Sequence, residues 1–254
     1  MTEIIQIPAF SDNYIYLIVD QDSRHSFCVD PGLSEPVLEE LKKRNLKLDY
    51  ILVTHHHNDH IGGTIKIKEQ TKCKIVGFRN DASRIPEIDI MVDEGHKLNL
   101  GRIIFEVFEV PGHTIGHVCY YSKDSKLLFC GDTLFSIGCG RVFEGTNEQM
   151  LESLLKIRSL PDDTRVFCGH EYTESNILFA LTLDPNNSNL LKKLEIVNEK
   201  RKNGQSTIPF LLGDEKKLNP FLNVDNTDYL EKIKMKGKTD LEIFNILRKK
   251  KDNF

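Results

Sequence analysis

Short apolar runs follow one another through roughly the first two thirds of the chain, separated by polar stretches or by stretches with helical spacing. An apolar run of this length predicts a strand, and a nearly continuous one predicts a strand covered on both faces. The run at residues 48–54 is nearly continuous. The predicted strands are NYIYLIVD (13–20), SFCVD (26–30), LDYILVT (48–54), RIIFEVFEV (102–110), HVCYYS (117–122), KLLFCGD (126–132) and RVFCGH (165–170).

Three segments between these runs have the spacing of helices. Ser34 is placed to cap the first, with Pro36 in its first turn. The second is expected over residues 60–67 and the third over residues 147–160. This alternation of strands and helices predicts a layered fold in which both kinds of element share one core.

The pattern changes after about Glu174, where the strand signals fade. Residues 189–203 and 239–251 are amphipathic with helical spacing, and the second segment opens with a capping box of Thr239 and Glu242. We therefore expect a sheet-rich domain over residues 1–172 and a smaller helical domain over residues 173–254.

Charge is distributed unevenly along the chain. The net charge is −4, but residues 231–254 hold eight Lys/Arg against four Asp/Glu, which is +4 and leaves −8 on the rest. A basic end on an acidic body indicates a small anionic partner near the C-terminus, or simply a solvated tail. The acidic body argues against nucleic acid and against an anionic membrane as partners.

The N-terminal stretch MTEIIQIPAF has no basic segment, and no stretch approaches the roughly 18 apolar residues of a membrane span. The six cysteines form no C-x-x-C pair and lie in or beside apolar runs. Both features predict a soluble cytoplasmic protein with buried, reduced thiols.

Polar residues suited to metal chemistry stand at four of the predicted strand ends. The segments are VTHHHNDH (53–60), VPGHTIGH (110–117), FCGDT (129–133) and VFCGHEY (166–172). Loops at strand ends are held by a rigid scaffold and commonly carry binding sites. We therefore expect one site assembled from four places in the sequence.

Alternation within the first segment divides its polar residues into two pairs. In an extended chain His55 and His57 point to one side, whereas His56 and Asn58 point elsewhere. Asp59 and His60 lie at the turn into the next helix and diverge from the first pair, an arrangement that suits two adjacent metal ions.

A two-metal site needs six or seven ligands, and the first segment offers four. His113, Asp132 and His170 supply the remainder, and Asp132 can bridge because a carboxylate has two oxygens. His117 is either a further ligand or a strand or supporting residue. Two ions about 3.5–4 Å apart can share a hydroxide and polarise a carbonyl, which predicts hydrolysis without a nucleophilic side chain.

The order T-H-x-H-x-D-H, H-T-x-G-H, G-D-T and G-H resembles the metallo-β-lactamase superfamily, over residues 54–170. This resemblance implies an α+β fold, an αββα sandwich with the metal site at one edge. The stretches SDNYIYLI, GDTLFSIGCGRVFEGT, CGHEYTESN, NPF and LRKKKDNF resemble the glyoxalase II family, the hydroxyacylglutathione hydrolases, through nearly the whole chain. That family hydrolyses S-D-lactoylglutathione to D-lactate and glutathione at a dinuclear site. We expect this protein to be a monomer.

The resemblance assigns a role to each metal ligand. One ion is expected at His55, His57 and His113, and the second at Asp59, His60 and His170, with Asp132 bridging both. Asp59 is also expected to orient the bridging hydroxide. Zinc is the expected metal, and iron and manganese suit the same donors.

The resemblance also assigns the glutathione contacts to Arg141, Phe143, Tyr172, Arg248 and Lys251. Glutathione carries two carboxylates, which explains the basic C-terminal end. Many family members have tyrosine where this chain has Phe143, so the hydroxyl group is missing here.

Two other functions remain open on the sequence. One is another glutathione-thioester hydrolase, or a persulfide dioxygenase with a single iron, of the same superfamily. The other is a metal-dependent nuclease, although a single short basic patch offers few contacts to the phosphates of a nucleic acid.

Restoring the hydroxyl by Phe143→Tyr is expected to lower KM for the glutathione thioester. One added hydrogen bond contributes roughly 0.5–1.5 kcal/mol, or about two- to tenfold in affinity. Steady-state kinetics of both enzymes test this, and an unchanged KM would contradict a substrate contact at this position.

Overall fold

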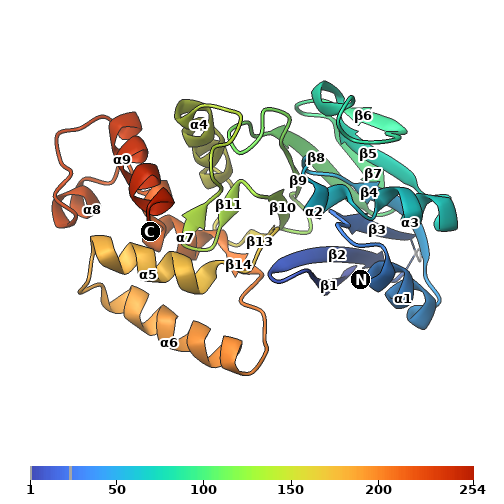
Figure 1. Ribbon diagram of the computed structural model, residues 1–254, viewed down its shortest axis with the longest axis horizontal. Coiled ribbons are helices and arrows are strands. Elements are labelled where there is room, and N and C mark those ends of the chain that lie inside the picture. The colour runs from blue at the N-terminus through green and yellow to red at the C-terminus, as the bar shows by residue number, and fades with distance from the viewer. Residues whose placement is uncertain (1, 23–24) are drawn as a thin grey trace. The chain divides into compact units, whose positions relative to one another are not determined.

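The computed structural model describes residues 2–22 and 25–254 (Figure 1). The chain forms two compact units. The first runs up to Glu109 and includes Gly116–Gly131, and the second comprises Val110–Ile115 and Asp132–Phe254. The domain boundary at residue 172 stays a prediction.

A six-stranded sheet with the strand order β1-β2-β3-β4-β5-β6 organises the first unit. The pairs β1–β2 and β2–β3 are antiparallel, and the remaining neighbours are parallel. Its strands are β1 (Thr2–Ala9), β2 (Asn13–Asp20), β3 (His25–Val29), β4 (Lys47–Leu52), β5 (Lys74–Phe78) and β6 (Ile90–Val92). The apolar pattern did not predict β1, an edge strand whose residues are mostly half-buried.

Helices α1 (Glu35–Arg44) and α3 (Thr64–Thr71) pack on this sheet. Their buried residues Val37, Leu41 and Ile67 join one apolar cluster with side chains of β1 to β5. Ser34 is the N-cap of α1 as predicted, although its hydroxyl donates to the Glu35 carboxylate instead of capping the helix. This packing holds the end of β4 in a fixed position.

The single helix predicted over residues 60–67 is wrong, because two helices occupy this region. The short α2 (Asn58–Ile61) ends before Gly62, and α3 begins at Thr64. A Cβ atom on Gly63 would lie 2.6 Å from the backbone of Leu33 and Ser34. The glycine therefore lets two backbone segments touch directly behind the histidine-rich loop.

Four antiparallel strands complete the first unit, β7 (Lys97–Leu100), β8 (Ile103–Glu109), β9 (Val118–Ser122) and β10 (Leu127–Gly131). Phe129 of β10 contacts Tyr16 of β2, with 5.5 Å between ring centroids, and also contacts Phe105 of β8. Tyr120 of β9 donates a hydrogen bond to the Val53 carbonyl. These buried contacts pack the four strands against the six-stranded sheet.

The second unit carries two small strand pairs. They are β11 (Leu134–Phe135) with β12 (Gly138–Cys139), and β13 (Arg165–Cys168) with β14 (Phe210–Leu211). Helix α4 (Asn147–Arg158) begins with a capping box formed by Thr146 and Gln149. It covers nearly the range predicted for the third helix.

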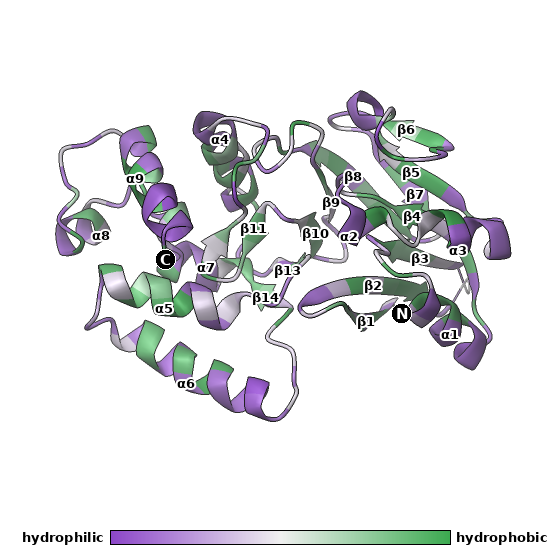
Figure 2. Ribbon diagram, in the orientation of Figure 1, coloured by the Kyte–Doolittle hydropathy of each residue, from purple (hydrophilic) through white to green (hydrophobic). Residues whose placement is uncertain are grey.

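Most of the remaining second unit is helical, as predicted, with α5 (Thr173–Leu183), α6 (Ser188–Lys202), α7 (Leu212–Leu218), α8 (Thr227–Lys232) and α9 (Asp240–Asp252). Apolar residues of α5 and α6 form one cluster, and Figure 2 shows that α6 also carries many hydrophilic positions. The predicted capping box of Thr239 and Glu242 opens α9.

All six cysteines are buried and free, as predicted. Within the described parts of the chain, no helix is both long enough and apolar enough to cross a bilayer.

Candidate metal centre

The segment from Thr54 to His60 leads from the end of β4 into α2. Thr54 and His55 are fully buried, and His57 has the extended conformation of an N-cap residue, with φ −58° and ψ 142°. Helix α2 then begins at Asn58, so Asp59 and His60 lie in its first turn. The change from extended chain to helix separates His55 and His57 from Asp59 and His60.

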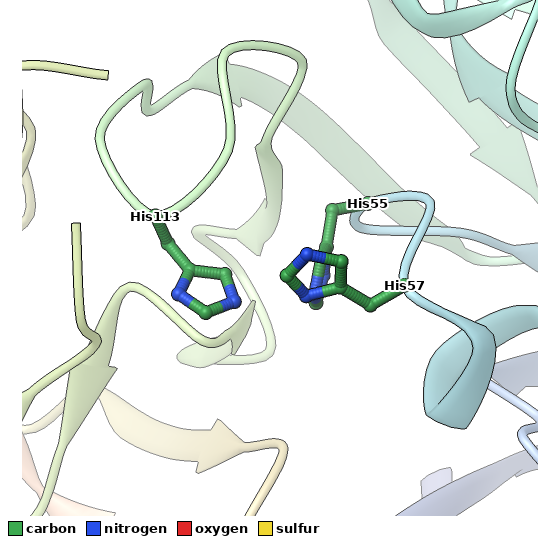
Figure 3. A group of neighbouring side chains, drawn as sticks. All are labelled: His55, His57 and His113. Carbon is green, nitrogen blue, oxygen red and sulfur yellow. The ribbon is translucent and has the colours of Figure 1, made fainter. Parts of the chain in front are cut away.

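His55 and His57 lie together (Figure 3). The Nε2 atom of His55 is 3.1 Å from Nδ1 of His57, and the rings are nearly perpendicular. His56 instead contacts the buried carboxylate of Asp81, with 3.2 Å between Nδ1 and Oδ2, and Asp81 also pairs with Arg84.

Asp59 and His60 form the second pair. His60 Nε2 lies 3.5 Å from Oδ2 of Asp59. The same Asp59 oxygen accepts a hydrogen bond of 2.8 Å from the side-chain amide of Asn13, at the start of β2. Asn13 is a site residue that the sequence analysis missed, although it lies in the stretch SDNYIYLI.

The buried carboxylate of Asp30 connects the two pairs. Its oxygens accept hydrogen bonds from the Thr54 backbone N–H at 2.8 Å and the Thr54 hydroxyl at 2.7 Å. Its Oδ2 also lies 3.0 Å from Nδ1 of His60. The Thr54 hydroxyl lies 3.0 Å from Nδ1 of His55. A single carboxylate therefore reaches one histidine of each pair.

These contacts determine the tautomers of both histidines. A carboxylate only accepts, so His60 donates from Nδ1 and keeps the lone pair on Nε2. The Thr54 hydroxyl donates its proton to Asp30 and so accepts from Nδ1 of His55, which leaves the lone pair of His55 on Nε2, the atom that faces His57. Asp30 stands at a strand end, the position where the sequence analysis found the other candidates.

His117 packs flat on His55. The ring centroids are 4.6 Å apart with 19° between the planes, and His117 is fully buried. Gly131 adopts φ +47°, and a Cβ there would lie 2.9 Å from Nε2 of His117. Among the described residues, the convergent His, Cys, Asp and Glu groups do not include His117. Its position favours the supporting role that the sequence left open.

Three more candidates lie together in the second unit. Oδ2 of Asp132 is 3.4 Å from Nε2 of His113 and 3.2 Å from Nε2 of His170. His113 donates from Nδ1 to the Arg141 carbonyl at 2.8 Å, which leaves its Nε2 lone pair for a metal. One oxygen of Asp132 thus faces both imidazoles, whereas the sequence suggested one oxygen for each ion.

The donor spacing fits divalent metal ions. Two ligands of one tetrahedral zinc ion lie roughly 3.3–3.6 Å apart, because each is about 2.0–2.2 Å from the metal. The four donor pairs just described are separated by 3.1, 3.5, 3.4 and 3.2 Å. Imidazole and carboxylate donors at this spacing match zinc, iron or manganese.

Two aromatic rings stand beside the histidines of the second unit. Phe143 has 62% of its surface exposed, and its ring centroid lies 5.2 Å from that of His113. Tyr172 stacks on His170 with 4° between the ring planes and 4.8 Å between centroids. Both side chains are accessible to a ligand.

The basic candidates differ in their surroundings. Arg141 is exposed, whereas Arg248 is 4% exposed and donates to the carbonyls of Cys139 and Gly140 and to Asp252. Burial lowers the pKa of Lys251 to about 8, and the positive charges of Arg248 and Arg141 add to this effect. The three cations therefore form one electropositive region.

The architecture and the order of the polar segments define the chain as a metallo-β-lactamase fold. The family model described as "Metallo-beta-lactamase superfamily" matches residues 10–170, and the model "Hydroxyacylglutathione hydrolase C-terminus" matches residues 171–254. The ETHE1 structure from Myxococcus xanthus shares the fold, with a TM-score of 0.67, 24% identity and coverage of 99% of this chain and 100% of that one.

Curated relatives define the family more closely. A hydroxyacylglutathione hydrolase of Rhodospirillum rubrum is 48% identical over 99% of this chain and 98% of its own length. Another, of Methylococcus capsulatus, is 44% identical over 100% of this chain and 99% of its own. The chain belongs to the hydroxyacylglutathione hydrolase family, which confirms the resemblance and the αββα fold class expected from the sequence.

Asp30→Asn is expected to weaken divalent-metal binding by about 10- to 100-fold, because a partner that orients two metal-binding histidines is lost. Asparagine tolerates the positive φ of 49° at this position, so the backbone is preserved. Competition with a chromogenic chelator measures the affinity.

Asp162→Asn is the matched control, since this exposed carboxylate pairs with Lys216, at 2.6 Å, and belongs to none of the candidate donor pairs. Metal affinity of Asp30→Asn equal to that of the control would contradict the orienting role.

Proposed function

We propose that this chain hydrolyses S-D-lactoylglutathione and related S-2-hydroxyacylglutathiones to a 2-hydroxy acid and glutathione. Full-length membership of the hydroxyacylglutathione hydrolase family carries this proposal. The four donor pairs support it, because their number and spacing suit two divalent ions. A dioxygenase with a single iron would need about half of these donors.

In this proposal His55, His57 and His113, drawn in Figure 3, hold one ion. Asp59, His60 and His170 would hold the second, and Asp132, whose Oδ2 faces both His113 and His170, would serve both. Zinc is the proposed metal, with iron or manganese compatible with the same donors. Two bound divalent ions supply a hydroxide nucleophile at neutral pH and polarise the thioester carbonyl.

The side chains of this proposed centre position the reacting groups. Asn13 fixes Oδ2 of Asp59, which leaves the other oxygen of that carboxylate to accept a hydrogen bond from the nucleophile and so to orient it. The leaving group is a thiolate whose conjugate thiol has a pKa of about 8.5, so it departs without a general acid.

Glutathione recognition is assigned to the electropositive region and the two aromatic rings. Arg141, which is exposed, and Lys251, which is half-buried, are the cations proposed to bind glutathione carboxylates. Phe143 and Tyr172 border the substrate beside His113 and His170. Arg248 is largely buried, so its proposed contribution is its charge and its hydrogen bonds to the carbonyls that precede Arg141.

We further propose that the protein acts as a cytoplasmic monomer on this small-molecule substrate, without nucleic-acid or membrane partners. The six free, buried cysteines support a reducing compartment.

Hydrolysis of S-D-lactoylglutathione, followed at the thioester absorbance, is expected to require about two metal ions per chain and to stop on chelation. Asp59→Asn should abolish turnover, because Asp59 both binds metal and orients the nucleophile. His96→Ala is the control, since His96 is exposed and lies outside every proposed donor set.

Metal content and oxygen uptake are measured on the same samples. Turnover that persists in metal-free protein would refute the two-metal mechanism. A single iron with oxygen uptake would establish the dioxygenase instead.

Substrate binding is expected to weaken as the pH rises through about 8. The pKa of Lys251 is lowered to about 8, so its ammonium is charged below that pH and loses its charge above it. KM measured between pH 6.5 and 9.5 should therefore rise at the alkaline end.

The Lys251→Met variant should have a higher KM than the wild type at low pH. Its KM should rise less at alkaline pH, because the loss of charge on Lys251 no longer contributes. Lys250→Met is the matched control on the same helix, because Lys250 is exposed. Identical pH profiles of KM for the Lys251 variant and the wild type would contradict the assignment.

A further inference from the structure

A cavity lies entirely within the second unit, along one side of α6. Its volume is about 430 Å³, within the range of pockets that hold small molecules. Buried residues form its floor, namely Thr173, Val197, Thr207 and Phe210. None of the side chains proposed for metal or glutathione lines this cavity, so the function proposed above leaves it unused.

The charged side chains at this cavity are mostly basic. Lys192, Lys193 and Lys200 of α6 line it, against a single acidic lining residue, Asp214. Lys193 is neutralised by the buried carboxylate of Glu215, 3.1 Å away. In the described parts of the chain, no ion pair involves Lys192 or Lys200, so both ammonium groups remain available to a ligand.

Apolar surface lies beside these lysines. Ile196 is 58% exposed and Leu211 is 46% exposed, and both line the cavity. Single exposed apolar residues are common on protein surfaces. Here the buried Val197 and Phe210 line the same cavity, so both its rim and its floor include apolar residues.

The floor also has polar groups with fixed positions. The hydroxyls of Thr173 and Thr207 are hydrogen-bonded to each other at 2.6 Å, and Glu171 accepts from the backbone N–H of Thr207 at 2.8 Å. Ser136, another lining residue, donates to Glu215 at 2.9 Å. The floor is therefore held by contacts that exist without a ligand, as expected of a preformed site.

We propose that this cavity is a second binding site, which takes a small organic anion with an apolar body, of the class of a medium-chain carboxylate. Lys192 and Lys200 pair with the carboxylate, and the chain lies against Ile196, Val197, Phe210 and Leu211. Charge complementarity and the four apolar lining residues distinguish this ligand class from an inorganic anion, which would leave those residues unused.

Octanoate is the probe for this site. Isothermal titration uses the metal-loaded full chain with saturating glutathione, which occupies the proposed active site. One octanoate is expected to bind per chain. Lys192→Gln combined with Lys200→Gln should weaken binding by roughly tenfold, since two exposed charge contacts are lost.

Two matched controls separate specific from general effects. Lys42→Gln with Lys123→Gln removes the same charge from exposed positions of the first unit and should leave the affinity unchanged. Ile196→Ser should weaken octanoate binding, whereas Leu191→Ser should not, because Leu191 is an exposed residue of α6 outside the cavity lining.

Three results would overturn the proposal. They are absence of octanoate binding at millimolar concentration, equal affinities for the two double-lysine variants, and an octanoate affinity that is much higher in a titration without glutathione than with it. The last result would place the probe in the proposed active site. Hydrolysis of the thioester is measured separately, so a failure of this site and a failure of the proposed activity are distinguishable.

Discussion

The buried carboxylate of Asp30 accepts hydrogen bonds from Thr54 and His60, and through the Thr54 hydroxyl it also determines the orientation of His55. Imidazole binds a metal only through an unprotonated nitrogen, so a cluster of histidines is useful only if each tautomer is fixed. Asp30 fixes two of them with one side chain. The sheet supports this arrangement, because Asp30 follows β3, Thr54 follows β4, and these two strands are parallel neighbours. Their adjacent ends bring the carboxylate and the hydroxyl together.

In the second unit, one carboxylate again contacts two histidines, because one oxygen of Asp132 faces both His113 and His170. Each of these histidines is also constrained on another side. The Arg141 carbonyl accepts from Nδ1 of His113, and the ring of Tyr172 stacks on His170. The proposed substrate residues are thus joined to the proposed metal-ligand imidazoles by hydrogen bonding and stacking. A change in substrate contacts at Arg141 or Tyr172 is therefore expected to alter the position of the proposed metal ligand beside it, His113 or His170.

Sequence reasoning identified the candidate ligands because their signal is local. Two-residue alternation separates His55 and His57 from His56, and strand ends mark Asp132 and His170. Supporting residues were missed because their partners are distant in sequence. Asp30 and His60 are 30 positions apart, and Asn13 and Asp59 are 46 apart. Such pairings depend on strand order, which hydrophobic periodicity does not determine.

The same limit explains the predictions that the structure refined. Helical spacing over residues 60–67 suggested one helix, but periodicity does not report the close backbone contact that requires Gly63. The basic C-terminal segment was evident from composition, yet composition does not show that Arg248 is buried and bonded to carbonyls 108 and 109 positions away. Burial of Lys251 lowers the pKa of its ammonium, and the positive charge of Arg248 beside it adds to this effect, so charging Lys251 is costly in the free protein. An anionic ligand beside these cations offsets that cost, so the cluster favours anionic ligands over neutral ones.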